Sequence, residues 1–253
     1  MAARAVSGAR VRAVLFDAAG TLIRPREPIG ETYARAARAH GVALAPERLT
    51  AAFRASFAEA KPMVFPAEAA DRVAARERAW WRDLVRATFA RAGAEEIPDF
   101  DALFAILWDA FAAPAAWQVA DGAAPALAEL RRGGVATGVV SNFDARLPRL
   151  LAGLGLAPLL DTVVVPSSAG ARKPDPAIFR AATDALGCAP SEAVHVGDDP
   201  RLDLAGARGA GLRAIDATRL ATLADLPAHI LRGDLRGFLW EPAAAGAPQE
   251  PGE

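Results

Sequence analysis

Cysteine is nearly absent from this 253-residue sequence, in which Cys188 is the single example. One thiol excludes an intramolecular disulfide framework and every metal or iron–sulfur site that needs several cysteines. A long apolar run is also missing, since the longest stretch, residues 150–160, contains two glycines and is too short to cross a bilayer. The N-terminal sequence MAARAVSGARVRAV carries positive charge without the apolar core of a signal peptide. We therefore expect a cytoplasmic protein with no membrane partner.

An excess of charge of either sign is lacking as well. The 29 lysines and arginines nearly balance the 30 aspartates and glutamates, which gives a net charge of −1. This balance argues against a nucleic-acid partner, because a domain that binds nucleic acid should be clearly basic. Lysine itself is scarce, since all the basic residues but Lys61 and Lys173 are arginine. A lysine retained in such a chain is a candidate functional residue.

Five short apolar runs, bounded by small or polar residues, indicate the fold. Continuous apolar runs of this length are typical of strands that are buried on both faces. Helical patterns lie between the later runs; one covers residues 121–132, and another runs to about Gly187 with Asp175 as its N-cap. Strands that alternate with helices predict an α/β fold, a doubly wound parallel sheet of the Rossmann-like kind. The predicted strands are residues 11–16, 136–140, 162–165, 193–196 and 212–215.

The segment between the first and second predicted strands has a different pattern. Its apolar and aromatic residues recur at helical spacing, which predicts an inserted, all-helical cap domain of about four helices. Residues 25–28 and 113–122 are the expected linkers. The predicted organisation is a core of residues 1–24 and 115–241, a helical cap of residues 25–114, and a disordered tail of residues 242–253.

Polar residues follow the predicted strands at the points where they end. Asp17 follows the first strand, Ser141 and Asn142 follow the second, and Lys173 lies beyond the third. The fourth strand is followed by two further acids, Asp198 and Asp203. Because ligands of open α/β sheets bind at the carboxyl ends of the strands, we expect these side chains to meet at one edge of the sheet.

Three carboxylates that meet in a cleft beside one lysine would repel one another strongly. A divalent cation relieves this repulsion, and ligation by oxygen alone suits Mg²⁺, so we predict a Mg²⁺ cofactor. A carboxylate held ionised by Mg²⁺ and Lys173 can attack phosphorus and form an aspartyl-phosphate. Hydroxyl and backbone N–H groups would hold the phosphoryl oxygens, and a glycine lets the backbone approach them closely. The predicted phosphate-binding residues are Ser141, Asn142, Gly20 and Lys173.

Four motifs occur in a fixed order along the chain. They are Asp-x-x-Gly-Thr-Leu from Asp17, Ser-Asn from Ser141, Lys-Pro-Asp-Pro from Lys173 and Gly-Asp-x-x-x-x-Asp from Gly197. In this order they resemble the four motifs of the haloacid dehalogenase superfamily of hydrolases, and the resemblance covers residues 11–239. The helical insert resembles the type-one cap of that superfamily.

The resemblance implies a role for each matching residue. Asp17 matches the nucleophile, Ser141 the phosphate-binding hydroxyl and Lys173 the residue that neutralises charge. Asp198 matches a metal ligand, as does the backbone carbonyl of Ala19, and Asp203 matches the second acid of the fourth motif. We therefore predict catalytic Asp17, Ser141 and Lys173, and metal-binding Asp17, Ala19, Asp198 and Asp203.

The sequence departs from the superfamily pattern at Ala19. Phosphatases that the chain resembles usually carry a second Asp at this position, which protonates the leaving alkoxide and activates water. A positioned acid–base group typically contributes about 10²–10⁴-fold. We therefore predict slow turnover of alkyl phosphates and a smaller loss for acyl or aryl phosphates, whose leaving groups need little protonation.

Several functions fit this departure. The favoured one is a hydrolase of a small phosphorylated metabolite with a substitute acid such as Asp199 or Glu27. A second is hydrolysis of a carbon–phosphorus bond, as in phosphonoacetaldehyde hydrolases, with Lys61 forming a Schiff base. A third is a binding or regulatory protein without turnover. Haloacid dehalogenation fits less well, because it uses no metal and leaves the acids of the fourth motif without a purpose.

Aromatic and imidazole side chains outside the motifs are assigned to packing. Trp80, Trp81 and Trp108 are expected in the core of the cap rather than against a substrate. Trp117 lies at a predicted linker, where it would help to seat the cap. His195 lies within a predicted strand and is expected in the core.

Overall fold

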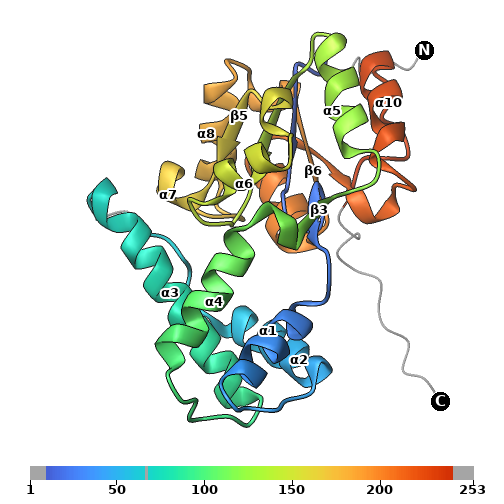
Figure 1. Ribbon diagram of the computed structural model, residues 1–253. Helices are drawn as coiled ribbons and strands as arrows, with labels where there is room; N and C mark the ends of the chain where they lie inside the picture. Colours follow the sequence, from blue (N-terminus) through green and yellow to red (C-terminus); the bar gives the residue numbers. More distant parts are fainter. Residues whose placement is uncertain (1–9, 66–67, 242–253) are drawn as a thin grey trace, which may run out of the picture.

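A parallel five-stranded sheet forms the centre of the α/β half of the molecule (Figure 1). The computed structural model describes residues 10–65 and 68–241. The strand order is β5-β4-β1-β6-β7, and all neighbouring pairs are parallel. Each predicted strand is present, with ends displaced by at most two residues. The strands are β1 (Ala13–Phe16), β4 (Ala136–Val140), β5 (Thr162–Val164), β6 (Ala193–Gly197) and β7 (Arg213–Asp216).

Helices cover both faces of this sheet. Successive side chains of a strand point to opposite faces, and β1 is buried on both. Val14 and Phe16 belong to the apolar cluster of the first face, and Ala13 and Leu15 to that of the second. The doubly wound α/β prediction is confirmed. The first face carries α5 (Ala123–Arg132), α6 (Leu147–Gly153) and α10 (Leu226–Arg232), and the second carries α8 (Pro176–Ala185) and α9 (Gly206–Gly209).

Short helical segments complete the connections of the core. A π-helical turn, η4 (Pro200–Ala205), precedes α9, and α7 (Pro166–Ala169) follows β5. The 3-10 turns of the core are η2 (Ala157–Leu159), η3 (Pro190–Glu192), η5 (Ala217–Arg219) and η6 (Leu223–Asp225).

The position of β1 in the strand order fixes where a ligand can bind. The chain continues from β4 to β5 on one side of β1, then crosses to β6 and β7 on the other side. The carboxyl end of β1 is therefore the point where the winding direction reverses, and ligands of open α/β sheets bind at this point. Asp17 follows β1 there, and its backbone N–H donates to the Val196 carbonyl at 2.9 Å.

Four helices form a separate layer below the sheet (Figure 1). They bury an apolar cluster of their own, in which Tyr33, Leu49, Phe89 and Leu103 are each almost fully buried. No strand lies between them in the described part of residues 29–112. The helices are α1 (Ile29–Ala39), α2 (Pro46–Glu59), α3 (Ala70–Arg91) and α4 (Phe100–Ala112). We call this layer the cap.

The two connections between cap and core are more ordered than predicted. The sequence predicts linkers, but β2 (Ile23–Pro25) and β3 (Trp117–Val119) pair as an antiparallel ribbon, with η1 (Pro114–Ala116) before β3. Strands of three residues are too short for alternation to be visible in the sequence. The ribbon joins the cap to the core through a paired backbone.

Some predicted boundaries also change. The sequence predicts Asp121 as the N-cap of a helix, but the N-cap of α5 is Gly122, whose φ is +78°, and the helix begins at Ala123. A Cβ on Gly122 would lie 2.3 Å from Thr222 Oγ1, so close packing favours glycine there.

The predicted tail, residues 242–253, lies outside the described residues. Within the described ranges, no helix combines the length and apolar character needed to span a bilayer.

Candidate active site

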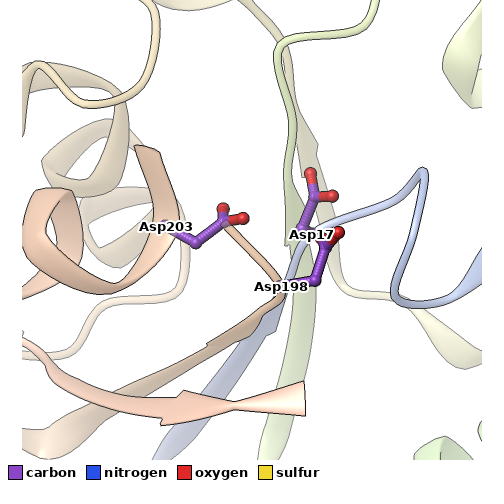
Figure 2. Close-up of side chains that lie close together, drawn as sticks. All are labelled: Asp17, Asp198 and Asp203. Carbon is purple, nitrogen blue, oxygen red and sulfur yellow. The ribbon is translucent and has the colours of Figure 1, made fainter. Parts of the chain in front are cut away.

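Three carboxylates converge at the carboxyl end of β1 (Figure 2). Asp17 directly follows β1, Asp198 directly follows β6, and Asp203 lies in the turn η4. Each offers one oxygen such that all three oxygens lie within 4.8 Å of one another. The predicted convergence of these acids is therefore present in the structure.

Lys173 lies between two of these acids. Its Nζ is 2.5 Å from Asp17 Oδ1 and 2.5 Å from Asp203 Oδ1, and the residue is 2% exposed. Burial lowers the pKa of this ammonium group, but the charges of Asp17 and Asp203 outweigh that effect and raise it. Lys173 is consequently held as a cation beside the Asp17 carboxylate.

Asn142 holds Lys173 in this position. The Asn142 Oδ1 accepts from the Lys173 N–H at 2.8 Å, and its Nδ2 donates to the Lys173 carbonyl at 3.1 Å. The sequence predicts Asn142 as a phosphate-binding residue, but its side-chain amide is committed to the backbone of Lys173. A second Nδ2 hydrogen has no partner among the described residues, and Asn142 lines the same cavity as Asp17, so its contact with phosphate stays a prediction.

Asp203 accepts hydrogen bonds from three groups of the protein. Besides Lys173, His195 Nε2 lies 2.9 Å from its Oδ1, and the Asp199 N–H donates to its Oδ2 at 3.1 Å. Burial favours a higher pKa for Asp203, but the His195 hydrogen bond and the Lys173 charge hold the pKa well below its usual value. The sequence places His195 in the core, and the structure adds this contact with the site.

The surroundings of Asp17 and Asp198 disfavour the ionised form of each carboxyl group. Burial raises the pKa of Asp17, although Lys173 opposes the shift. Burial and the nearby charges of Asp17 and Asp203 raise the pKa of Asp198 to about 6. Three carboxyl groups against one ammonium leave an excess of negative charge, which a bound cation would stabilise.

The turn after Asp17 approaches Asp198 closely. Gly20 has φ +108°, and a Cβ on it would lie 2.6 Å from Asp198 Oδ2. Thr21 Oγ1 donates to Asp198 Oδ1 at 3.3 Å, a contact that the sequence does not single out. The Ala18 carbonyl accepts from the next turn, whereas the Ala19 carbonyl accepts no hydrogen bond from the described residues. The Ala19 oxygen is therefore free for a ligand.

Ser141 directly follows β4, which flanks β1 on the side opposite to β6 and Asp198. The residue is nearly buried, and it lines the same cavity as Asp17 and Lys173. Its backbone N–H donates to the Val164 carbonyl at 3.1 Å, but within the described residues its hydroxyl has no hydrogen-bond partner. The hydroxyl is thus available to a ligand beside the three acids.

A family model for haloacid dehalogenase-like hydrolases matches residues 11–211. The chain is a haloacid dehalogenase-like hydrolase. Human haloacid dehalogenase-like hydrolase domain-containing protein 3 is 38% identical to it over 205 residues, which span 81% of each protein. The resemblance of the four motifs is confirmed at the level of the family.

Solved structures share the fold of this hydrolase. A haloacid dehalogenase family hydrolase from Deinococcus radiodurans with bound phosphate and sodium is 25% identical, with a TM-score of 0.58 and coverage of 81% of this chain and 80% of that one. A 2-haloacid dehalogenase from Pseudomonas syringae is 27% identical, with a TM-score of 0.57 and coverage of 88% and 99%. Because one of these is a 2-haloacid dehalogenase and the other was solved with bound phosphate, the shared fold does not decide the reaction, which must be argued from the site.

The hydrolase has a cavity of about 440 Å³ between the acids and the cap. Trp81 and Trp108 line this cavity with the catalytic candidates, whereas Trp80 does not. Trp81 and Trp108 pack against the apolar core of the cap, as predicted, and they also face the cavity. We call one part of the cavity wall the aromatic chamber, formed by Tyr33, Phe53, Phe57, Phe111, Trp117 and Phe143.

The loop after β4 also fastens the cap of the hydrolase. Trp81 Nε1, on α3, donates to Asp144 Oδ2 at 2.7 Å, and Glu77 Oε2 accepts from the Ala145 N–H at 3.0 Å. Arg146 binds Asp144 and lies over the Trp108 ring, 3.5 Å from its centre. Trp117 Nε1 donates to the Phe111 carbonyl at 3.0 Å, which agrees with the predicted role of Trp117 in seating the cap.

Three residues considered for other chemistry are engaged elsewhere. Lys61 is exposed and does not line the cavity, which argues against a Schiff base there. Glu27 binds Arg35 and Thr32, and these hydrogen bonds lower its pKa, so it is a poor general acid. Asp199 caps η4 by accepting from the N–H groups of residues 201 and 202.

Proposed function

We propose that the protein is a Mg²⁺-dependent hydrolase of a small phosphorylated metabolite that reacts through an aspartyl-phosphate on Asp17. The observation that carries the proposal is the Asp17 carboxylate at the carboxyl end of β1, with Lys173 Nζ 2.5 Å away. An ammonium group at this distance neutralises charge on the nucleophile and on an incoming phosphoryl group.

The donor atoms suit a magnesium ion. Asp17 and Asp198 supply carboxylate oxygens, and the Ala19 carbonyl has no other partner among the described residues. Mg²⁺ favours a few such oxygens together with water and phosphate. Since Asp203 already accepts from three protein groups, we assign it to positioning Lys173 rather than to direct ligation, contrary to its place among the predicted ligands. When bound, the ion would neutralise charge on the phosphoryl oxygens.

Each side chain then has a separate role in the reaction. Asp17 Oδ1 is bound to Lys173, which leaves Oδ2 to attack phosphorus and displace the leaving oxygen. The Ser141 hydroxyl donates to a phosphoryl oxygen, and Lys173 neutralises the negative charge that gathers in the transition state. Water then attacks phosphorus, breaks the aspartyl-phosphate and restores the Asp17 carboxylate.

The lack of an acid–base group at Ala19 is the main limit on the rate of this reaction. No carboxyl group stands at that position, and the substitutes considered in the sequence are engaged: Glu27 with Arg35, and Asp199 as a helix cap. A missing acid–base group costs about 10²–10⁴-fold in rate. Alkyl phosphates should therefore react slowly, and phosphates with acidic leaving groups should react faster.

The test is the release of 4-nitrophenolate from 4-nitrophenyl phosphate. We expect turnover that needs Mg²⁺, stops with EDTA and is lost in Asp17→Asn, while Asp184→Asn on the exposed face of α8 stays active. Absence of turnover over a broad panel of phosphates, with Mg²⁺ still bound, would instead support a binding protein.

A further inference from the structure

The aromatic chamber is a continuous row of rings that leads to the phosphoryl site. In the order Phe57, Phe53, Tyr33, Phe111, Trp117 and Phe143, successive ring centres are between 5.6 and 6.4 Å apart. The first ring belongs to α2 of the cap, and the last follows Ser141 and Asn142 in the core. A group attached to a phosphate at Ser141 would therefore lie against this row.

The indole N–H groups near these rings donate to acceptors within the protein. Trp117 Nε1 donates to the Phe111 carbonyl, and Trp81 Nε1, on the same cavity wall, donates to Asp144. Burial raises the pKa of Tyr33 well above its usual value, so its hydroxyl stays uncharged. The chamber consequently presents ring faces, which favour an apolar ligand with few hydrogen-bonding groups.

Phe57 offers an exposed apolar ring that such a ligand would cover. Its ring lines the cavity, yet 40% of the residue is exposed, which is unusual for a large apolar side chain in this structure. Covering apolar surface of this kind is favourable in proportion to the area removed from water. The cavity volume of about 440 Å³ falls within the range of about 300–1,000 Å³ that encloses drug-sized ligands.

Ala19 supplies a second, independent constraint on the ligand. Without an acid at this position, the leaving oxygen must depart as an anion. A phenol has a pKa of about 10, as in tyrosine, whereas the pKa of water is ~15.7 and that of a simple alcohol is similar. An aryl oxide is therefore a far better leaving group here than an alkoxide.

We infer that the substrate class is a phosphate monoester of a bulky phenol, with its ring system held in the aromatic chamber. The inference rests on the proposed function. Asp17 Oδ2 forms a bond to phosphorus while the aryl oxygen–phosphorus bond breaks and its electron pair leaves with the phenolate. Water then hydrolyses the aspartyl-phosphate, and a proton from that water neutralises the phenolate, so the products are the phenol and hydrogen phosphate.

The experiment compares kcat/KM for three probes in the presence of Mg²⁺. Acetyl phosphate has a good leaving group but no ring, phenyl phosphate has one ring, and 2-naphthyl phosphate has two rings with a leaving group of similar acidity. A single methylene in an apolar pocket changes selectivity by about 10–200-fold. We therefore expect 2-naphthyl phosphate to exceed phenyl phosphate by at least about tenfold.

Two variants test whether the chamber causes this preference. Phe57→Ala shortens the row of rings at an exposed position, so the ratio of kcat/KM for 2-naphthyl to acetyl phosphate should fall by about tenfold. Ile106→Ala is the matched control, because Ile106 is 48% exposed on α4 and does not line the cavity. This control should leave the ratio unchanged.

The possible failures can be told apart. If acetyl and phenyl phosphate are hydrolysed but the second ring gives no advantage, the inference about the chamber is overturned and the proposed function stands. The same holds if the advantage survives Phe57→Ala. If no probe is hydrolysed with Mg²⁺, the proposed function fails and the inference fails with it.

Discussion

The indole N–H of Trp81 donates a 2.7 Å hydrogen bond to the buried carboxylate of Asp144 and so joins the cap to the core. Asp144 also accepts from the backbone and guanidinium of Arg146, whose Nη1 donates to the Trp108 carbonyl on α4. One carboxylate of the core thereby connects to two cap helices. The position of the cap over Asp17 depends on these contacts.

Trp81→Phe should loosen this attachment while keeping an aromatic ring in place. A hydrogen bond to a charged group contributes about 1.5–3 kcal/mol, and we expect the free energy of unfolding to fall by that amount. Urea denaturation measures the change. Trp80→Phe is the matched control, because Trp80 Nε1 donates at 2.7 Å to the Lys61 carbonyl within the cap. Equal decreases in the free energy of unfolding of the two variants would show that the hydrogen bond to Asp144 stabilises the protein no more than the one to the Lys61 carbonyl.

Ala19→Asp should restore the missing acid–base group. We expect hydrolysis of an alkyl phosphate such as benzyl phosphate to rise by up to about 10²–10⁴-fold, and that of 4-nitrophenyl phosphate to rise much less. Steady-state release of phosphate from both compounds measures the difference. No gain on the alkyl phosphate would mean that another group already serves as the acid.

The wild-type protein should accumulate the aspartyl-phosphate. Nitrophenolate departs without a proton donor, but the attack of water on the intermediate lacks the base that an Asp at position 19 would supply. We expect a rapid burst of nitrophenolate close to one equivalent of enzyme, followed by slower turnover. Stopped-flow absorbance records the burst, and Ala19→Asp should shorten it. A linear trace from the first turnover would show that water attack is not the slow step.

Asp198 should make the metal-free protein less stable as it ionises. Burial and the charges of Asp17 and Asp203 raise its pKa to about 6, above the value near 4 of an unfolded chain. The contribution to stability is therefore full below about pH 4 and is lost as the pH rises through about 6. At neutral pH without metal, Asp198→Asn should raise the free energy of unfolding by up to about 2 kcal/mol, after allowance for partial exposure.

Magnesium provides the control for this prediction. Saturating Mg²⁺ should stabilise the wild-type protein by mass action but stabilise Asp198→Asn much less, because a ligand is missing. Urea denaturation with EDTA or with Mg²⁺ gives all the values, and Asp184→Asn should behave like the wild type. Equal stabilisation of wild type and Asp198→Asn by Mg²⁺ would remove Asp198 from the proposed ligands.

The sequence predicts the sheet and the meeting of Asp17, Lys173 and Asp198 for a simple physical reason. Parallel strands end at the same edge, so residues that follow them must meet once the strands are identified. The contacts of Asn142 and His195 depend on side-chain directions within the loops, which no periodicity encodes. Their roles therefore emerge only with coordinates.

The sequence predicts that the cap is helical, but it does not predict which side of each cap helix faces the cavity. The helical stripes that include Trp81 and Trp108 show which residues are apolar, yet they do not show which of them face a cavity and which face other helices. The ribbon of β2 and β3 escapes prediction because each strand has three residues. The aromatic chamber depends on both features, so its existence could not be read from the chain.

Four consecutive residues after β4 have four separate tasks. Ser141 lines the cavity beside Asp17, Asn142 binds the backbone of Lys173, Phe143 packs on Trp117, and Asp144 accepts from Trp81. Because a single short peptide serves both halves of the protein, the halves are not interchangeable modules. A chimera that receives a foreign cap in place of residues 25–114 would also need residues 141–144 from the protein that donates the cap. Engineering of specificity should therefore exchange the cap and this tetrapeptide together.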